Sequence, residues 1–222
     1  MLFIRHNVYT VNTIVTPRNE GKSVARQADP DLEHRILSAA RRLWNRGAGK
    51  ALTMRAVARA ARTNTPAVYR RFPHRDDILR ALLLRIRAEI TEELRAALSV
   101  EEACEHYVDY ALHHPHDYEL YYLHEYELLF SDKSSRDVTL NQLLKEKRPA
   151  IELMKGKLAA QLGGVPDDHE RLTLALWALL HGTVMLLIAK TIHPPHMEEL
   201  RAASRTALDT LLRESSHSRR SE

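Results

Sequence analysis

The chain has 222 residues, of which 44% are hydrophobic and 28% are charged, and this balance excludes a chain that is disordered throughout. Only 7 Gly and 9 Pro occur, which favours a helical protein over one built from short strands joined by turns. The single cysteine, Cys104, excludes an internal disulfide and a zinc site built from several thiolates. We therefore predict an all-α protein of the reducing cytoplasm.

The basic residues are concentrated in one part of the chain. Residues 31–75 contain eleven Lys and Arg but two Asp and Glu, a net charge of +9, whereas the whole chain carries +4. A basic module on a mildly acidic body is typical of a protein that binds a polyanion, because each cation placed on a phosphate releases a counterion. Two alternatives fit this pattern: a sequence-specific DNA-binding protein, and a helical interaction or structural protein that binds nucleic acid non-specifically.

An arm and an amphipathic helix come first. Residues 1–28 show no apolar period, so we expect a flexible N-terminal arm. Apolar residues such as Ile36 and Trp44 then recur at helical spacing. They follow the capping residues 29–31 and precede two glycines within 47–49. A helix is predicted between these signals.

Two short helices are predicted next. Thr53 is placed to cap a helix that reaches about Ala61, and a break follows at residues 62–64. A third helix begins with Thr65 as its cap, and the Phe-Pro pair at residues 72–73 stops it. Two short helices separated by a tight three-residue break, in a basic segment, are the pattern of a helix-turn-helix.

The rest of the chain is predicted to be helical as well. A long helix should connect the basic module to the body, and the last residues, 215–222, should form a disordered tail. We therefore predict a DNA-binding domain over 29–76 and a larger helical ligand-binding and dimerisation domain over 77–214. The helices of the second domain are expected at residues 76–98, 101–114, 116–130, 136–162 with a kink near Pro149, 167–190 and 195–214.

Residues 172–189 form the most apolar segment. Its length reaches the minimum for a membrane span, but it carries His181 and lacks a flanking cluster of Lys and Arg. We do not expect it to cross a membrane. A helix that is apolar nearly all round must be covered on more than one face, and we expect a second copy of the chain to supply that cover.

The segment from Leu52 to Leu79 resembles the helix-turn-helix signature of the TetR family of bacterial repressors. The sequence departs from that signature at Arg62, where the family usually has a turn glycine, and at Thr63, which replaces a buried valine. The matching residues are Thr53, Val57, Ala58, Ala61, Asn64, Val68, Tyr69, Phe72, Arg75 and Ile78 or Leu79.

The resemblance implies specific roles in DNA binding. Thr53, Tyr69 and Arg75 would hold phosphates, because hydroxyls, helix N-terminal amides and cations are the groups that bind them. Arg71 would reach guanine O6 and N7, and the methyl group of Ala67 would touch a thymine methyl. The complete predicted set is Thr53, Arg55, Thr65, Pro66, Ala67, Tyr69, Arg70, Arg71 and Arg75.

The resemblance also covers the C-terminal part. The phrase Trp177-Ala178-Leu179-Leu180-His181-Gly182 resembles the Trp-His-Gly motif of one TetR subtype, and residues 110–130 match it loosely. TetR-like proteins dimerise through their last two long helices, which implies a homodimer through residues 167–190 and 195–214.

A ligand pocket is expected in the body, lined by aromatic residues with a few polar groups. We predict a repressor that an unknown small-molecule effector releases from a palindromic operator. The predicted lining residues are Tyr107, Tyr110, Tyr122, Tyr126, Trp177, His181 and Met185.

Other chemistry has little support in the sequence. The histidines at 113, 114, 116, 193 and 196 lack the spacing of a metal-binding helix, so we predict no metal site. No Gly-rich phosphate loop or Gly-x-Ser-x-Gly elbow occurs, and we predict neither a cofactor nor enzymatic activity.

Overall fold

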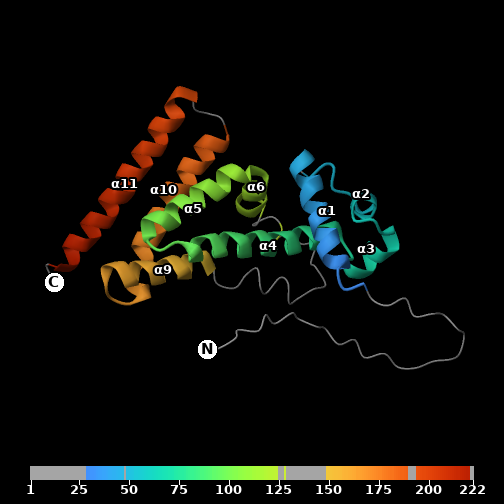
Figure 1. The fold of residues 1–222 in the computed structure, drawn as a ribbon, viewed down its shortest axis with the longest axis horizontal. Helices are drawn as coiled ribbons and strands as arrows, with labels where there is room; N and C mark the ends of the chain where they lie inside the picture. The colour runs from blue at the N-terminus through green and yellow to red at the C-terminus, as the bar shows by residue number, and fades with distance from the viewer. Residues whose placement is uncertain (1–28, 48, 125–127, 129–148, 190–193, 221–222) are drawn as a thin grey trace, which may run out of the picture. The chain divides into compact units, whose positions relative to one another are not determined.

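A computed structural model describes residues 29–47, 49–124, 128, 149–189 and 194–220, and these residues are helices and their connections (Figure 1). No strand occurs among them, which confirms the all-α prediction. The helices are α1 (Leu32–Gly47), α2 (Met54–Ala60), α3 (Thr65–Arg71), α4 (Arg75–Ala96), α5 (Val100–His113), α6 (Pro115–Leu123), α9 (Pro149–Leu162), the 3-10 turn η1 (Pro166–His169), α10 (Glu170–Ile188) and α11 (Pro194–Arg220). The predicted arm, residues 1–28, lies outside the described residues.

Helices α1, α2 and α3 pack into a small domain at the start of the described chain (Figure 1). Thr53 caps α2 as predicted, since its hydroxyl accepts a hydrogen bond from the Ala56 amide at 3.2 Å. The cap predicted for α3 is wrong by one residue. Asn64, not Thr65, accepts a hydrogen bond from the Ala67 amide, at 2.8 Å, because Thr65 is already the first helical residue.

The turn between α2 and α3 places Arg62 in the left-handed region, with φ of 54°. The amide of Thr63 donates to the carbonyl of Ala58 at 2.9 Å, which closes the end of α2. Arg62 therefore takes the conformation that the family's glycine provides, despite its Cβ, at a cost of about 1–2 kcal/mol.

Helix α4 runs from the small domain into the body, where it packs against α5 and α9. Apolar residues along its length, including Ile78, Leu82, Ile86 and Ile90, are buried. It ends at Ala96, two residues before the predicted end, because the chain then turns to let Ser99 cap α5.

The body consists of α5, α6, α9, α10 and α11, with α10 packed against α5, α9 and α11. Helix α6 ends at Leu123, and residues 136–148 of the predicted helix at 136–162 lie outside the described part of the chain. Helix α11 continues to Arg220, so the predicted disordered tail is wrong for residues 215–220.

Helix α10 and the turn before it, Pro166–Ile188, are long and apolar enough to span a membrane by composition. A single helix of this kind is also common in the core of a soluble protein. Here Leu176, Leu180, Val184 and Leu187 of α10 are buried against the neighbouring helices of the body, so packing accounts for the apolar character of that side of the helix.

Candidate DNA-binding surface and body cavity

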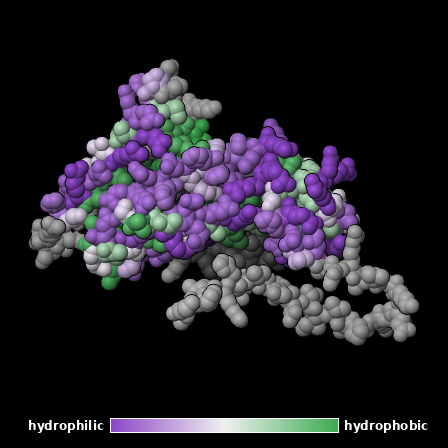
Figure 2. All heavy atoms as spheres, in the orientation of Figure 1, coloured by the Kyte–Doolittle hydropathy of each residue, from purple (hydrophilic) through white to green (hydrophobic). Residues whose placement is uncertain are grey.

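Helices α2 and α3 form a helix-turn-helix whose inner residues are small and whose outer residues are basic. Val57, Ala58 and Val68 are buried between the helices of the small domain. The outer side of α3 exposes Tyr69, which is 50% exposed, together with Arg70. Figure 2 shows the surface of this small domain as predominantly hydrophilic. A helix of this kind fits the major groove, with its apolar side held by the domain.

The predicted DNA-binding residues differ in their exposure. Thr65 is half-buried, and Ala67 is 7% exposed, so the Ala67 methyl group offers little surface to a thymine. We therefore do not include Ala67 among the proposed DNA contacts. The residues of the predicted set that are exposed are Thr53, Arg55, Pro66, Tyr69, Arg70 and Arg71.

Arg71 forms an ion pair with Glu33 at the start of α1. The two side chains are 53% and 40% exposed, and exposed ion pairs contribute only about 0–1 kcal/mol. Another partner could therefore replace Glu33 at little cost.

Arg75 holds the loop before α2. Its Nε donates to the Leu52 carbonyl at 3.0 Å and its Nη2 donates to the Gly49 carbonyl at 3.0 Å. Gly49 has φ of +85°, and a Cβ there would lie 2.8 Å from the Trp44 ring, so only glycine fits. Arg75 was predicted to bind a DNA phosphate. In the structure its guanidinium also positions the N-terminus of α2.

The small domain is joined to α6 by charged and polar contacts that no sequence pattern indicated. Arg41 of α1 donates to Asp117 of α6 through Nε at 2.8 Å and through Nη2 at 2.5 Å. The same guanidinium donates to Glu89 of α4 at 3.0 and 2.7 Å. Trp44 of α1 donates from its indole nitrogen to the carbonyl of His116, at 2.7 Å.

Burial and charge act in opposite directions in this cluster. Burial opposes the ionisation of Glu89, but its hydrogen bonds with Arg41 and the charges of Arg41 and Arg85 outweigh it and lower the pKa of Glu89. Burial likewise opposes the charge of Arg41, while Asp117 and Glu89 raise its pKa. The Asp117 side chain is 0% exposed, and its Oδ1 has no partner among the described residues. Arg41 is therefore the principal partner of a fully buried carboxylate.

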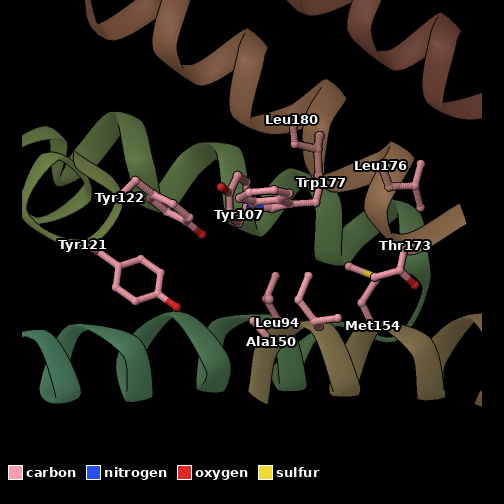
Figure 3. A pocket seen from close by; sticks show the side chains of 11 residues that line it. Leu94, Tyr107, Tyr121, Tyr122, Ala150, Met154, Thr173, Leu176, Trp177 and Leu180 are labelled. Atoms are coloured by element: carbon pink, nitrogen blue, oxygen red, sulfur yellow. The ribbon is translucent and has the colours of Figure 1, made fainter. Parts of the chain in front are cut away.

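A cavity lies in the body between α4, α5, α6, α9 and α10 (Figure 3), and its envelope of about 510 Å³ includes open solvent. Three of the predicted lining residues, Tyr107, Tyr122 and Trp177, line it. The other lining residues, which the sequence did not single out, are Leu94, Tyr121, Ala150, Ile151, Met154, Thr173, Leu176 and Leu180.

The remaining predicted pocket residues lie elsewhere. Tyr110 donates to Glu89 at 3.3 Å and belongs to the Arg41 cluster, and Met185 is not among the lining residues. His181 lies behind the wall, with its ring stacked on Trp177 at a centroid distance of 5.5 Å. Tyr126 is outside the described residues.

Tyrosine hydroxyls beside the cavity are connected in a chain. The hydroxyls of Tyr107 and Tyr118 are 3.0 Å apart, and the Tyr118 hydroxyl lies 2.6 Å from Nδ1 of His181. Burial is the main reason why the pKa values of Tyr107, Tyr118 and Tyr122 are raised above the ordinary value for tyrosine. These hydroxyls stay protonated at physiological pH.

Comparison with known proteins agrees with this architecture. Residues 36–82 match the family model described as bacterial regulatory proteins, tetR family, and residues 100–211 match the tetracyclin repressor-like C-terminal domain. The sequence matches no curated protein.

Solved structures show the same fold at low identity. A protein of unknown function from Rhodococcus sp. RHA1 is 21% identical with a TM-score of 0.62, over 86% of this chain and 98% of that one. A TetR-like transcriptional regulator from the same organism is 19% identical, TM-score 0.54, over 84% and 96%. A TetR variant from Acinetobacter baumannii AYE, in complex with minocycline, is 19% identical, TM-score 0.53, over 81% and 93%. The C-terminal model alone covers half of the chain, and the chain therefore belongs to the TetR family of DNA-binding transcriptional regulators.

Proposed function

We propose that this regulator is a homodimeric repressor that binds a near-palindromic operator and is released by a small-molecule effector. The observation that carries the proposal is the outer side of α3, where Tyr69, Arg70 and Arg71 are exposed in a strongly basic domain. A cavity in the body and direct contacts between α6 and α1 support the effector part. We also propose the cytoplasm as its compartment, on the strength of the single reduced Cys104.

Contacts with DNA are divided by their chemistry. Thr53, Arg55, Tyr69 and Arg75 are assigned to phosphates, which supply affinity without sequence preference. Arg71 is assigned to a guanine, with a second base contact from Arg70 and further contacts from Thr65 and Pro66.

A homodimer is proposed through α10 and α11. Leu174 and Leu186 of α10 are 47% and 42% exposed, although large apolar side chains are usually buried. Ala175, Ala178 and Gly182 are exposed between them at helical spacing, so one face of α10 is apolar and narrow enough for close packing. Figure 2 shows hydrophobic surface over the α10 and α11 pair. A two-fold axis along this face would bury it against the same face of a second copy.

Effector control is proposed to act through α6. This helix carries Tyr121 and Tyr122 at the cavity and Asp117 at the contact with Arg41, so both sites share one short rigid element. An effector releases DNA only if it binds more tightly to a conformation that does not fit the operator. A shift of α6 on binding would move α1 through Arg41 and Trp44.

The finer assignments follow the same proposal. We place the DNA-binding domain at residues 29–76 and the effector and dimerisation domain at 77–214, since α4 begins at Arg75. We assign the body to the Trp-His-Gly subtype, for which the stacked rings of Trp177 and His181 are the structural support.

Selection of binding sites from a random DNA pool tests the proposal. The wild type is expected to select a near-palindrome, because two copies related by a two-fold axis read two equivalent half-sites. Arg71→Ala should relax the selected sequence at one symmetric position, at about 1–3 kcal/mol per contact. Arg55→Ala should weaken all sites alike, and Arg95→Ala at the exposed end of α4, outside both α3 and the proposed dimer interface, is the matched control with no effect. Equal affinity for random and selected DNA at roughly 150 mM salt would refute sequence-specific recognition.

A further inference from the structure

The described wall of the body cavity is electrically neutral. None of its lining residues in the described part of the chain carries a charged side chain. Three of the eleven are tyrosines, and the other eight are aliphatic residues, one Met, one Trp and one Thr. Tyr107 and Tyr122 keep their protons, because burial raises the pKa of both. A charged ligand would lose its hydration here without gaining an opposite charge, which makes its transfer strongly unfavourable.

One polar atom in this wall lacks a partner. Thr173 of α10 is 1% exposed, and its Oγ1 forms no hydrogen bond with any described residue. A buried hydroxyl is normally paired, because leaving it unpaired costs free energy. Thr173 lines the cavity but its Oγ1 is covered in the unbound protein, so a bound molecule would supply the missing partner once the covering side chains move aside.

Aromatic surface covers another part of the wall. Tyr122 and Trp177 both line the cavity, and their ring centroids lie 6.4 Å apart at an interplanar angle of 35°. Figure 3 shows Tyr122, Tyr107 and Trp177 in an upper row, with Leu94 and Ala150 below them. Rings of this kind favour stacked or edge contacts with a planar molecule.

We infer that the effector of this regulator is an uncharged, largely apolar molecule with a planar ring system and one hydrogen-bonding group directed at Thr173. This inference rests on the proposed function, in which the cavity is the effector site. Among the described lining residues, none carries a charge that would hold an organic acid, a phosphate or a quaternary amine.

A series of probes that share one ring and differ in charge tests the inference. Calorimetric titration of the full-length protein, without DNA, would compare 2-naphthamide, 2-naphthoate and 2-naphthylmethylammonium. The neutral amide is expected to bind at least tenfold more tightly than either ion. The inference is overturned if an ion binds as tightly as the amide, or if the amide does not bind at millimolar concentration.

The role of Thr173 is tested with Thr173→Val, which replaces the hydroxyl with a methyl group of similar size. Affinity for 2-naphthamide should fall about three- to tenfold, the range expected for one lost hydrogen bond, while affinity for 2-methylnaphthalene stays the same or rises. Thr183→Val is the matched control, because Thr183 is buried in the same helix but bonds to Leu179 and Ser204 away from this cavity. Equal losses for both probes would refute the assigned hydrogen bond.

The two levels of the proposal can fail separately. Binding is measured on the protein alone, whereas the repressor function is measured by release of selected DNA. If the amide binds selectively and DNA is not released, the ligand class stands and effector control by this cavity fails. If an anion releases DNA and the amide does not, effector control stands and the ligand class fails.

Discussion

Removing the Arg41 guanidinium should strongly destabilise the contact between the small domain and the body. Arg41→Met keeps the aliphatic stem but removes both hydrogen bonds to Asp117, at 2.8 and 2.5 Å. The Asp117 side chain is 0% exposed and would be left as a buried carboxylate with only the half-exposed His114 ring, 3.9 Å away, among its described ionic neighbours. Removing one partner of a buried ion pair costs about 3–5 kcal/mol.

The magnitude depends on how much of the cluster is exposed. Arg41 and Glu89 are 21% and 32% exposed, so water can replace part of their interaction, and the Glu89 pair adds at most about 1 kcal/mol. The loss from Asp117 dominates. We expect Arg41→Met to lower the free energy of unfolding by about 3 kcal/mol, which is a large share of the stability of a typical domain.

Urea unfolding at a fixed protein concentration measures this loss, since dimerisation makes stability depend on concentration. Arg42→Met is the control: Arg42 is the exposed neighbour, and its loss should cost less than about 0.5 kcal/mol. Adding Asp117→Asn to Arg41→Met should restore more than half of the lost stability, because the unpaired charge is removed. A cost below about 1 kcal/mol for Arg41→Met, or no recovery in the double variant, would refute the reasoning.

Three other changes test separate features. The pKa of Glu89 is lower in the folded protein than in the unfolded chain, so Glu89 stabilises the fold fully above the unfolded pKa, and this stabilisation is lost as the pH falls through the folded pKa. Glu89→Gln should therefore reduce the loss of stability that is measured between roughly pH 5 and 3. Leu186→Glu should give a folded monomer in sedimentation, whereas Leu187→Glu should unfold the chain because Leu187 is only 3% exposed. An unchanged dimer for Leu186→Glu would contradict the proposed interface. Arg62→Gly should raise the midpoint of thermal unfolding by relieving the left-handed strain, a net gain of about 0.5–1 kcal/mol, and a lower midpoint would contradict that account.

Local signals in the sequence were sufficient for the small domain. The ends of α1, α2 and α3 follow from glycine, proline and capping residues within a few positions of each end. Helix capping and helix breaking depend on residues that are neighbours in the sequence, so the sequence is enough to predict them. The one error, Thr65 for Asn64, arose because both side chains can cap a helix and only the backbone decides which comes first.

Sequence also predicted the class of the body but not its site. Tyr107 and Tyr110 are three residues apart on α5 and equally suited to a pocket, yet Tyr107 lines the cavity and Tyr110 bonds to Glu89. A helical period indicates that residues are buried, but it does not indicate which neighbour covers them.

Most helices, the basic helix-turn-helix and the family resemblance could be predicted from the sequence, because periodicity, caps and charge are properties of neighbouring residues. Only helix packing shows that Arg41 pairs with Asp117, 76 residues away, and that the Thr173 hydroxyl of a cavity-lining residue has no hydrogen-bond partner among the described residues. Both depend on how distant helices pack. Packing brings charges together or isolates a hydroxyl through contacts that lie across the fold, so no local pattern of residues records them.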